Sequence, residues 1–188
     1  MKPFPIVTAL TLALAAPAAF ADRDGDKIRA KLIGYSEVPS VSTVASGEFE
    51  ARISRDEQFI DFELTYRGLQ GTVTQSHIHF GQRHTAGAIV IWLCGTATNP
   101  GPAGTQTCPP STSTGVTVTG TLRAADVVVP PATTGAQQIT AGELAEVIAA
   151  IRVGAAYANV HSNLSPGGEI RGQIRADRGH GHDDDHGH

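Results

Sequence analysis

Two histidines, His77 and His79, lie two residues apart in the segment Thr-Val-Thr-Gln-Ser-His-Ile-His-Phe-Gly, residues 72–81. This segment is predicted to be a β-strand, in which residues two apart leave the same face about 6 to 7 Å from each other. Neutral imidazoles are natural ligands for copper and zinc. A third histidine, His161, lies in a similar setting much later in the chain. If its strand pairs beside the first, the three histidines would form a metal site with one open position.

A second interpretation of these histidines needs no metal. Buried histidines also hydrogen-bond to neighbouring polar groups and fasten a sheet. Under this interpretation, the candidate partners of His77 and His161 are Ser76, Asn159, Ser162 and Glu169. Ligands of one ion must lie close to it, so ring nitrogens more than about 6 Å apart, with no rotamer that joins them, would exclude the metal site.

Three other polar residues near these motifs are expected to have ordinary roles. Glu169 and Arg171 alternate with apolar residues in the last strand, which indicates one wet and one dry face. We expect both on the wet face, as a surface salt bridge that stabilises little. His84 follows the histidine pair in a loop, where it is either a fourth ligand or, as we expect, an exposed side chain.

A second histidine cluster closes the chain, in residues 177–188. It contains three aspartates and the histidines His180, His182, His186 and His188. The segment has nothing apolar to bury and is expected to be disordered. Such a cluster could gather nickel, copper or zinc with modest affinity. The alternative is a solvated tail without a function.

The two cysteines, Cys94 and Cys108, flank a stretch rich in Gly, Pro and Thr. An even cysteine count in an exported protein favours a disulfide. Closing a loop of about 15 residues contributes on the order of 3 kcal/mol in the chain-entropy model. Cysteines of thiolate zinc sites are spaced more closely, so metal ligation by this pair is the weaker hypothesis.

Export is predicted from the N-terminus. Residues 1–21 combine Lys2, an apolar run and the small residues Ala19 and Ala21, the pattern of a secretory signal peptide cleaved after Ala21. A membrane anchor is the alternative, but Pro17 interrupts the run, which is also short for a span of about 20 residues. The mature chain is expected to be secreted or periplasmic, and not membrane-spanning.

Charge excludes one class of partner. The chain has 14 Lys and Arg against 18 Asp and Glu, with a formal net charge of −4. Nucleic-acid binding needs clustered cations, so we expect no nucleic acid as a partner. The expected partner is a metal ion or an unidentified extracytoplasmic protein.

Short strands must position these residues. Strands are predicted from apolar patterning at 27–32, 47–53, 58–66, 72–81, 88–94, 119–122, 127–129, 156–161 and 169–175. One short α-helix is predicted near residues 141–153, opened by a capping box of Thr140 and Glu143 and ended by Gly154. The pattern predicts one all-β domain over 22–176, an antiparallel β-sandwich or barrel.

Several short motifs follow one another along residues 27–175 and together cover nearly all of this stretch. They are Gly34-Tyr35-Ser36-Glu37-Val38-Pro39, Leu64-Thr65-Tyr66, Ser76-His77-Ile78-His79, Tyr157-Ala158-Asn159-Val160-His161-Ser162 and Pro166-Gly167-Gly168-Glu169-Ile170-Arg171-Gly172-Gln173. With these motifs the chain resembles the CHRD domain family, named after repeats in chordin and found in exported bacterial proteins. The resemblance implies a compact β-rich exported domain, which in chordin belongs to a protein that binds growth factors. Phe80 departs from the family, where a glycine often follows the second histidine.

Three functions are consistent with the sequence. The preferred one is a non-enzymatic exported binding protein with a copper or zinc site at His77, His79 and His161. The second is a protein-interaction or structural module without metal. The third is a copper oxidoreductase, because copper-zinc superoxide dismutase is similar in having His-x-His followed by Phe-Gly. The sequence shows neither the further histidines and aspartate of that enzyme's zinc subsite nor a Gly-x-Ser-x-Gly nucleophile elbow.

Overall fold

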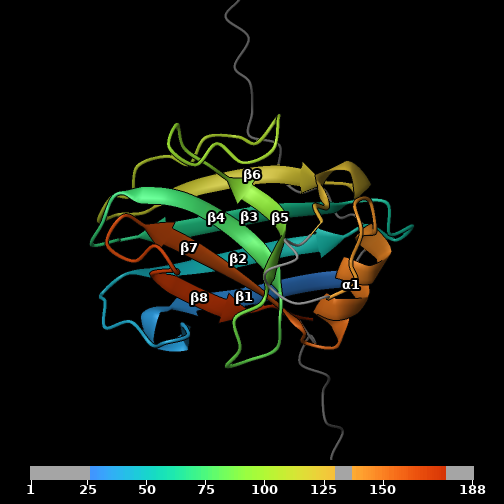
Figure 1. Cartoon of the computed structure of the whole chain (residues 1–188), viewed down its shortest axis with the longest axis horizontal. Coiled ribbons are helices and arrows are strands. Elements are labelled where there is room, and N and C mark those ends of the chain that lie inside the picture. Colours follow the sequence, from blue (N-terminus) through green and yellow to red (C-terminus); the bar gives the residue numbers. More distant parts are fainter. Residues whose placement is uncertain (1–25, 130–136, 177–188) are drawn as a thin grey trace, which may run out of the picture.

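The computed structural model describes residues 26–129 and 137–176 (Figure 1). The predicted signal peptide and the histidine-rich segment fall within 1–25 and 177–188, outside the described residues. In the part of the chain that the structure describes, no helix is long and apolar enough to cross a membrane.

One antiparallel sheet makes up most of the described chain. Its strands are β1 (Asp26–Ile33), β2 (Ser46–Ile53), β3 (Ile60–Arg67), β4 (Val73–Phe80), β5 (Ala88–Cys94), β6 (Val116–Leu122), β7 (Ala156–Ser162), β8 (Ile170–Gln173) and β9 (Arg175–Ala176). The order is β5-β4-β7-β8-β1-β2-β3-β6, with β9 paired to β1. The sheet curls into a nearly closed barrel, which confirms the predicted antiparallel all-β class (Figure 1).

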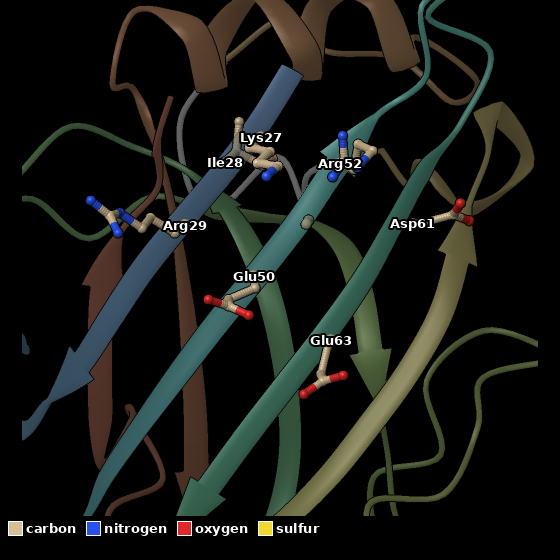
Figure 2. Close-up of a pocket in the computed structure, with 8 residues that line it drawn as sticks. Lys27, Ile28, Arg29, Glu50, Arg52, Asp61 and Glu63 are labelled. Atoms are coloured by element: carbon tan, nitrogen blue, oxygen red, sulfur yellow. The ribbon is translucent and has the colours of Figure 1, made fainter. Parts of the chain in front are cut away.

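Alternate residues of each strand fill the barrel interior. The register of β1, β2 and β3 places Ala30, Phe49 and Leu64 side by side, and all three are buried. The residues between them lie on the outer face, where Figure 2 shows Glu50 and Glu63 on neighbouring strands. Full burial of a Leu or Phe side chain contributes about 1.5–3 kcal/mol, so these interior rows drive formation of the barrel.

Helix α1 (Leu144–Arg152) begins later than predicted. Thr140 N does donate to Glu143 Oε2 at 2.8 Å, so half of the predicted capping box forms. The helix does not start there, because Gly142 adopts a positive φ of 89° and Glu143 is the N-cap residue. The predicted stop is confirmed, since Gly154 follows the helix with φ 74°. The apolar side of α1 joins the core at one end of the barrel (Figure 1).

The loop between β5 and β6, which a disulfide ties to the end of β5, bridges the seam between these two strands. The predicted disulfide joins Cys94, at the end of β5, to Cys108. Gln106 Nε2, in the loop between them, donates to Leu93 O of β5 and to Thr119 O of β6, each at 3.1 Å. The edge strands differ from the prediction. Strand β6 starts at Val116 rather than 119, and the strand predicted at 127–129 is reduced to a single bridge of Val127 with Ile91.

Candidate metal centre

Strand β7 pairs antiparallel with β4 and brings the third histidine beside the first two. The register places His77 opposite Asn159 and His161 opposite Gln75. Cross-strand partners share a face of the sheet, as do residues two apart on one strand. His77, His79 and His161 therefore lie on the same face, which is the condition set by their spacing in the sequence.

This face is the outer face of the barrel, yet it is buried. Ile78 on β4 and Val160 on β7 point the other way and are fully buried in the core. His77, His79 and His161 are only 0%, 7% and 5% exposed. Loops cover this part of the outer face, so β4 is buried on both sides.

The pairing of strand β5 with β4 is irregular beside the histidines. The register shifts between Ser76 and His77, and again between Ile78 and His79. Such bulges re-aim side chains and are frequent beside functional sites. Across the first shift, Trp92 lies opposite His77, with ring centroids 4.3 Å apart at 81°. The indole therefore covers one side of the histidine cluster.

The three rings converge. One nitrogen of each histidine lies within 4.8 Å of the others. His77 Nδ1 and His161 Nε2 are 3.2 Å apart. With bonds of about 2.0 Å, two nitrogen ligands of a tetrahedral ion are separated by about 3.3 Å. The three residues can therefore hold a metal ion, and their separations fall well inside the limit of about 6 Å that would have excluded one.

Backbone carbonyls fix the tautomers of two of these rings. His79 Nδ1 lies 2.9 Å from Gly87 O, and His161 Nδ1 lies 2.9 Å from Pro166 O. A carbonyl oxygen only accepts, so both rings carry their proton on Nδ1 and present a lone pair on Nε2. His77 Nδ1 must then donate to His161 Nε2, which leaves the lone pair of His77 Nε2 free. Carbonyls in this outer position orient histidine ligands in known metal sites.

The rings are neutral near pH 7. Burial lowers the pKa of His77 to about 2, with a further contribution from the neighbouring imidazoles. Burial also lowers the pKa of His79 to about 4, and it lowers that of His161 below its ordinary value. Neutral imidazole is the form that binds a metal ion.

In the comparison with protein-family models, residues 28–174 match the CHRD domain. The chain belongs to the CHRD domain family. Comparisons with curated proteins and with solved structures gave no match. Within the CHRD domain, the motif that ends at His79 and the motif that contains His161 are adjacent strands, β4 and β7. The two halves of the family signature therefore meet at the histidines.

The hydrogen bonds of this CHRD domain differ from those that the metal-free interpretation predicted. Ser76 Oγ donates to Asn159 O at 2.6 Å, and Ser162 Oγ accepts from Ser165 N at 3.2 Å. The rings of His77 and His161 instead hydrogen-bond to each other. The His161 ring also hydrogen-bonds to the Pro166 carbonyl.

The prediction that Glu169 and Arg171 lie on a solvent-exposed face of the last strand is wrong, because loops cover that face. Glu169 is 1% exposed and accepts from Gln70 N at 2.7 Å and Thr43 Oγ1 at 2.9 Å. The Glu169 carboxylate therefore links the β7–β8 connection, in which it lies, to the β1–β2 and β3–β4 connections. It does not form the expected surface pair.

Arg171, also expected at the surface, is 2% exposed. Its guanidinium donates to Thr85 O at 2.8 Å and to Gln82 O at 3.1 Å. Its Cζ lies 3.3 Å from the ring centroid of Tyr157, which stacks on His79 at 4.6 Å. Arg171 therefore holds the β4–β5 loop in place through two hydrogen bonds. The same loop contains Gly87, whose carbonyl orients His79. This loop also carries His84, which is exposed, with φ 66°, and is not one of the three clustered histidines.

Glu37 is the residue of this neighbourhood that the sequence did not single out. It is 6% exposed, and burial raises the pKa of its carboxyl to about 7, against the opposing effect of Arg171. Asn159 hydrogen-bonds to Glu37 and also interacts with His79. Glu37 lies in the first CHRD motif, but no spacing rule links it to histidines on β4 and β7.

Proposed function

We propose that this CHRD domain protein is an exported, non-enzymatic binding protein that holds copper or zinc with His77, His79 and His161. The observation that carries the proposal is the convergence of three buried ring nitrogens within 4.8 Å of one another. The carbonyls of Gly87 and Pro166 support it, because they leave two Nε2 lone pairs directed away from the backbone.

The ligand set favours copper over zinc. Nitrogen ligands bind copper(II) more tightly than zinc in the usual order of divalent metals, and imidazole suits both. The fit is also supported by His79 Nε2, which is buried without a hydrogen-bond partner. A buried acceptor without a partner costs about 1–3 kcal/mol, which coordination to an ion would offset.

Calorimetry on chelator-treated protein at pH 7 tests the proposal. We expect one tight site for copper(II) and a weaker one for zinc at the same place. His161→Ala should lower the copper affinity of this site more than about 100-fold, because a lost ligand exceeds the 10- to 100-fold effect of a lost outer partner. His84→Ala, the exposed histidine of the β4–β5 loop, is the matched control and should bind like the wild type. Failure of the wild type to bind either metal would refute the proposal.

The C-terminal histidines are proposed as a weaker, separate metal-collecting segment. The proposal is supported by the density of His and Asp in residues 177–188. Replacing His180, His182, His186 and His188 by serine in the full chain should remove only weak binding events. Loss of the tight event in that variant would show that the tight site is in the tail instead.

Export is proposed from the signal-peptide pattern of residues 1–21, and the Cys94–Cys108 disulfide supports it. Mass spectrometry of the secreted or periplasmic protein should give a mature N-terminus at Asp22. An uncleaved chain retained in the cell would contradict this.

A protein-interaction module is the second candidate function. Membership of the CHRD family suggests it, and exposed apolar side chains at the connections between strands support it. Tyr35, Val44 and Leu164 are 70%, 84% and 67% exposed. Tight copper binding that is lost in His161→Ala would favour the metal function over this one.

A further inference from the structure

Four buried side-chain atoms in the described part of the chain have no hydrogen-bond partner, and they gather in one place. They are Glu37 Oε1, His77 Nε2, His79 Nε2 and Asn159 Oδ1. The tautomer deduced above makes His79 Nε2 an acceptor, the amide oxygen of Asn159 accepts, and Glu37 Oε1 accepts when its carboxyl is ionised. The proposed metal ion would accept the lone pair of His79 Nε2, and the oxygens of Glu37 and Asn159 remain without a partner.

Asn159 connects the oxygens to the histidines. It is the cross-strand partner of His77, it interacts with His79, and it hydrogen-bonds to Glu37. Gly168 closes over the same place, with φ 127°. A Cβ atom on Gly168 would collide with Glu37 Oε1 and would lie 2.9 Å from Asn159 Nδ2. Only glycine at this position lets the backbone approach the side chains of Glu37 and Asn159 so closely.

Glu37 is too distant to be a ligand alongside all three histidines. The group of metal-binding atoms within 4.8 Å of one another contains only the histidines among the described residues. A carboxylate that accepts from a molecule bound to the ion is expected about 4 Å from the ion, given a metal bond of about 2.0 Å and a hydrogen bond of about 2.7 Å. Glu37 lies outside the group of three histidines and is linked to it through Asn159, which contacts both Glu37 and His79.

We propose that the three-histidine site keeps its fourth position for a small hydrogen-bond-donating ligand, water being the simplest, and that Glu37 and Asn159 accept its hydrogen bonds. This inference rests on the proposed metal function. It makes the site an open one that exchanges ligands, unlike a closed structural site with four protein ligands. Molecules with a hydroxyl or amine donor suit the two oxygens, whereas ligands that only accept do not.

The copper(II)-loaded full-length protein provides the test, with azide as a probe that only accepts. Azide binding is followed by its charge-transfer absorption, and bound water by the relaxation of solvent protons. The wild type should show a rapidly exchanging water on copper and weak azide binding. Glu37→Gln places an amide donor near the ligand, so the Kd for azide should fall by about tenfold, the scale of one added hydrogen bond of about 1.4 kcal/mol.

Glu50→Gln is the matched control, because it makes the same chemical change on the outer face of β2 (Figure 2). It should leave the Kd for azide unchanged. Asn159→Leu provides a second variant of similar size, and it should weaken the solvent-proton relaxation of the copper form.

Failure of the proposed metal function and failure of this inference give different results. If the wild type binds no copper, both the proposed function and this inference fail. If copper binds but no exchanging water is seen, or azide binds wild type and Glu37→Gln equally, only the inference is overturned. Loss of copper binding in Glu37→Gln alone would show that Glu37 is a ligand, which also overturns the inference.

Discussion

His77 Nδ1 and His161 Nε2 lie 3.2 Å apart although 84 residues separate the two histidines in the sequence. The antiparallel pairing of β4 with β7 produces this contact, and the carbonyls of Gly87 and Pro166 orient the rings around it. The contact joins two distant family motifs into one buried polar cluster on the outside of an apolar barrel.

The metal-free protein should lose stability as the pH falls below about 6.5. The folded pKa values of His77 and His79 are about 2 and about 4, against an ordinary value of 6.5. Below pH 6.5 the unfolded chain therefore binds protons that the folded chain does not, and the free energy of unfolding falls. Above pH 6.5 both states are neutral at these residues, and they contribute no slope.

Urea unfolding between pH 8 and pH 4 measures this effect. His77→Gln should reduce the slope below pH 6.5, whereas His84→Gln should keep it. An unchanged slope in His77→Gln would contradict the assignment of the pH dependence to this ring.

Glu37→Gln should stabilise the metal-free protein at pH 8 but not at pH 4. Burial raises the pKa of the Glu37 carboxyl from 4.5 to about 7. The folded chain therefore holds a proton that the unfolded chain releases above pH 4.5, and this stability is lost as the pH rises through 7. Glutamine stays neutral, so the gain at pH 8 should approach about 3 kcal/mol. Equal gains in chemical denaturation at both pH values would point to a cause other than charge.

Arg171→Lys should loosen the β4–β5 loop. Lysine keeps the charge but cannot reproduce the two-pronged contact with the carbonyls of Gln82 and Thr85. Loss of one such bond costs about 1.5 kcal/mol, so amide exchange in the loop should be roughly tenfold faster. Arg175→Lys, on the exposed strand β9, is the control. Faster exchange in both variants would rule out a specific role for the two hydrogen bonds of Arg171 in holding this loop.

Reduction of the Cys94–Cys108 disulfide should weaken the seam of the barrel. The double change to serine should lower the free energy of unfolding by about 3 kcal/mol in the chain-entropy model. Gln106 loses its anchored position between β5 and β6 in that variant, so hydrogen exchange at the backbone of β6 should increase. Gln106→Ala, with the disulfide intact, separates the amide contribution from that of the crosslink.

Sequence patterning predicted the strands and the histidine face because strand alternation is a local property. His77 and His79 needed only a period of two, and the patterning of residues 156–161 placed His161 on another strand. Patterning could not show that loops bury this face, so Arg171 was wrongly placed at the surface. An alternating strand reveals which residues share a side, but not what covers that side.

Other features depend on backbone conformation or on distant contacts. The helix was predicted to begin near 141, and the positive φ of Gly142 delays it to Leu144. Glu37 became part of the site only through tertiary contact with Asn159. A single carboxylate in a loop has no spacing that relates it to histidines on two strands.

The wide sequence separation of His77 and His161 also determines how a bound ion would leave. An unfolded chain could keep both rings on one ion only by closing a loop of 84 residues, at a cost of about 4 to 5 kcal/mol in the chain-entropy model. Unfolding and metal release would then be a single event. The lifetime of the folded barrel would set how long the metal is kept from other molecules.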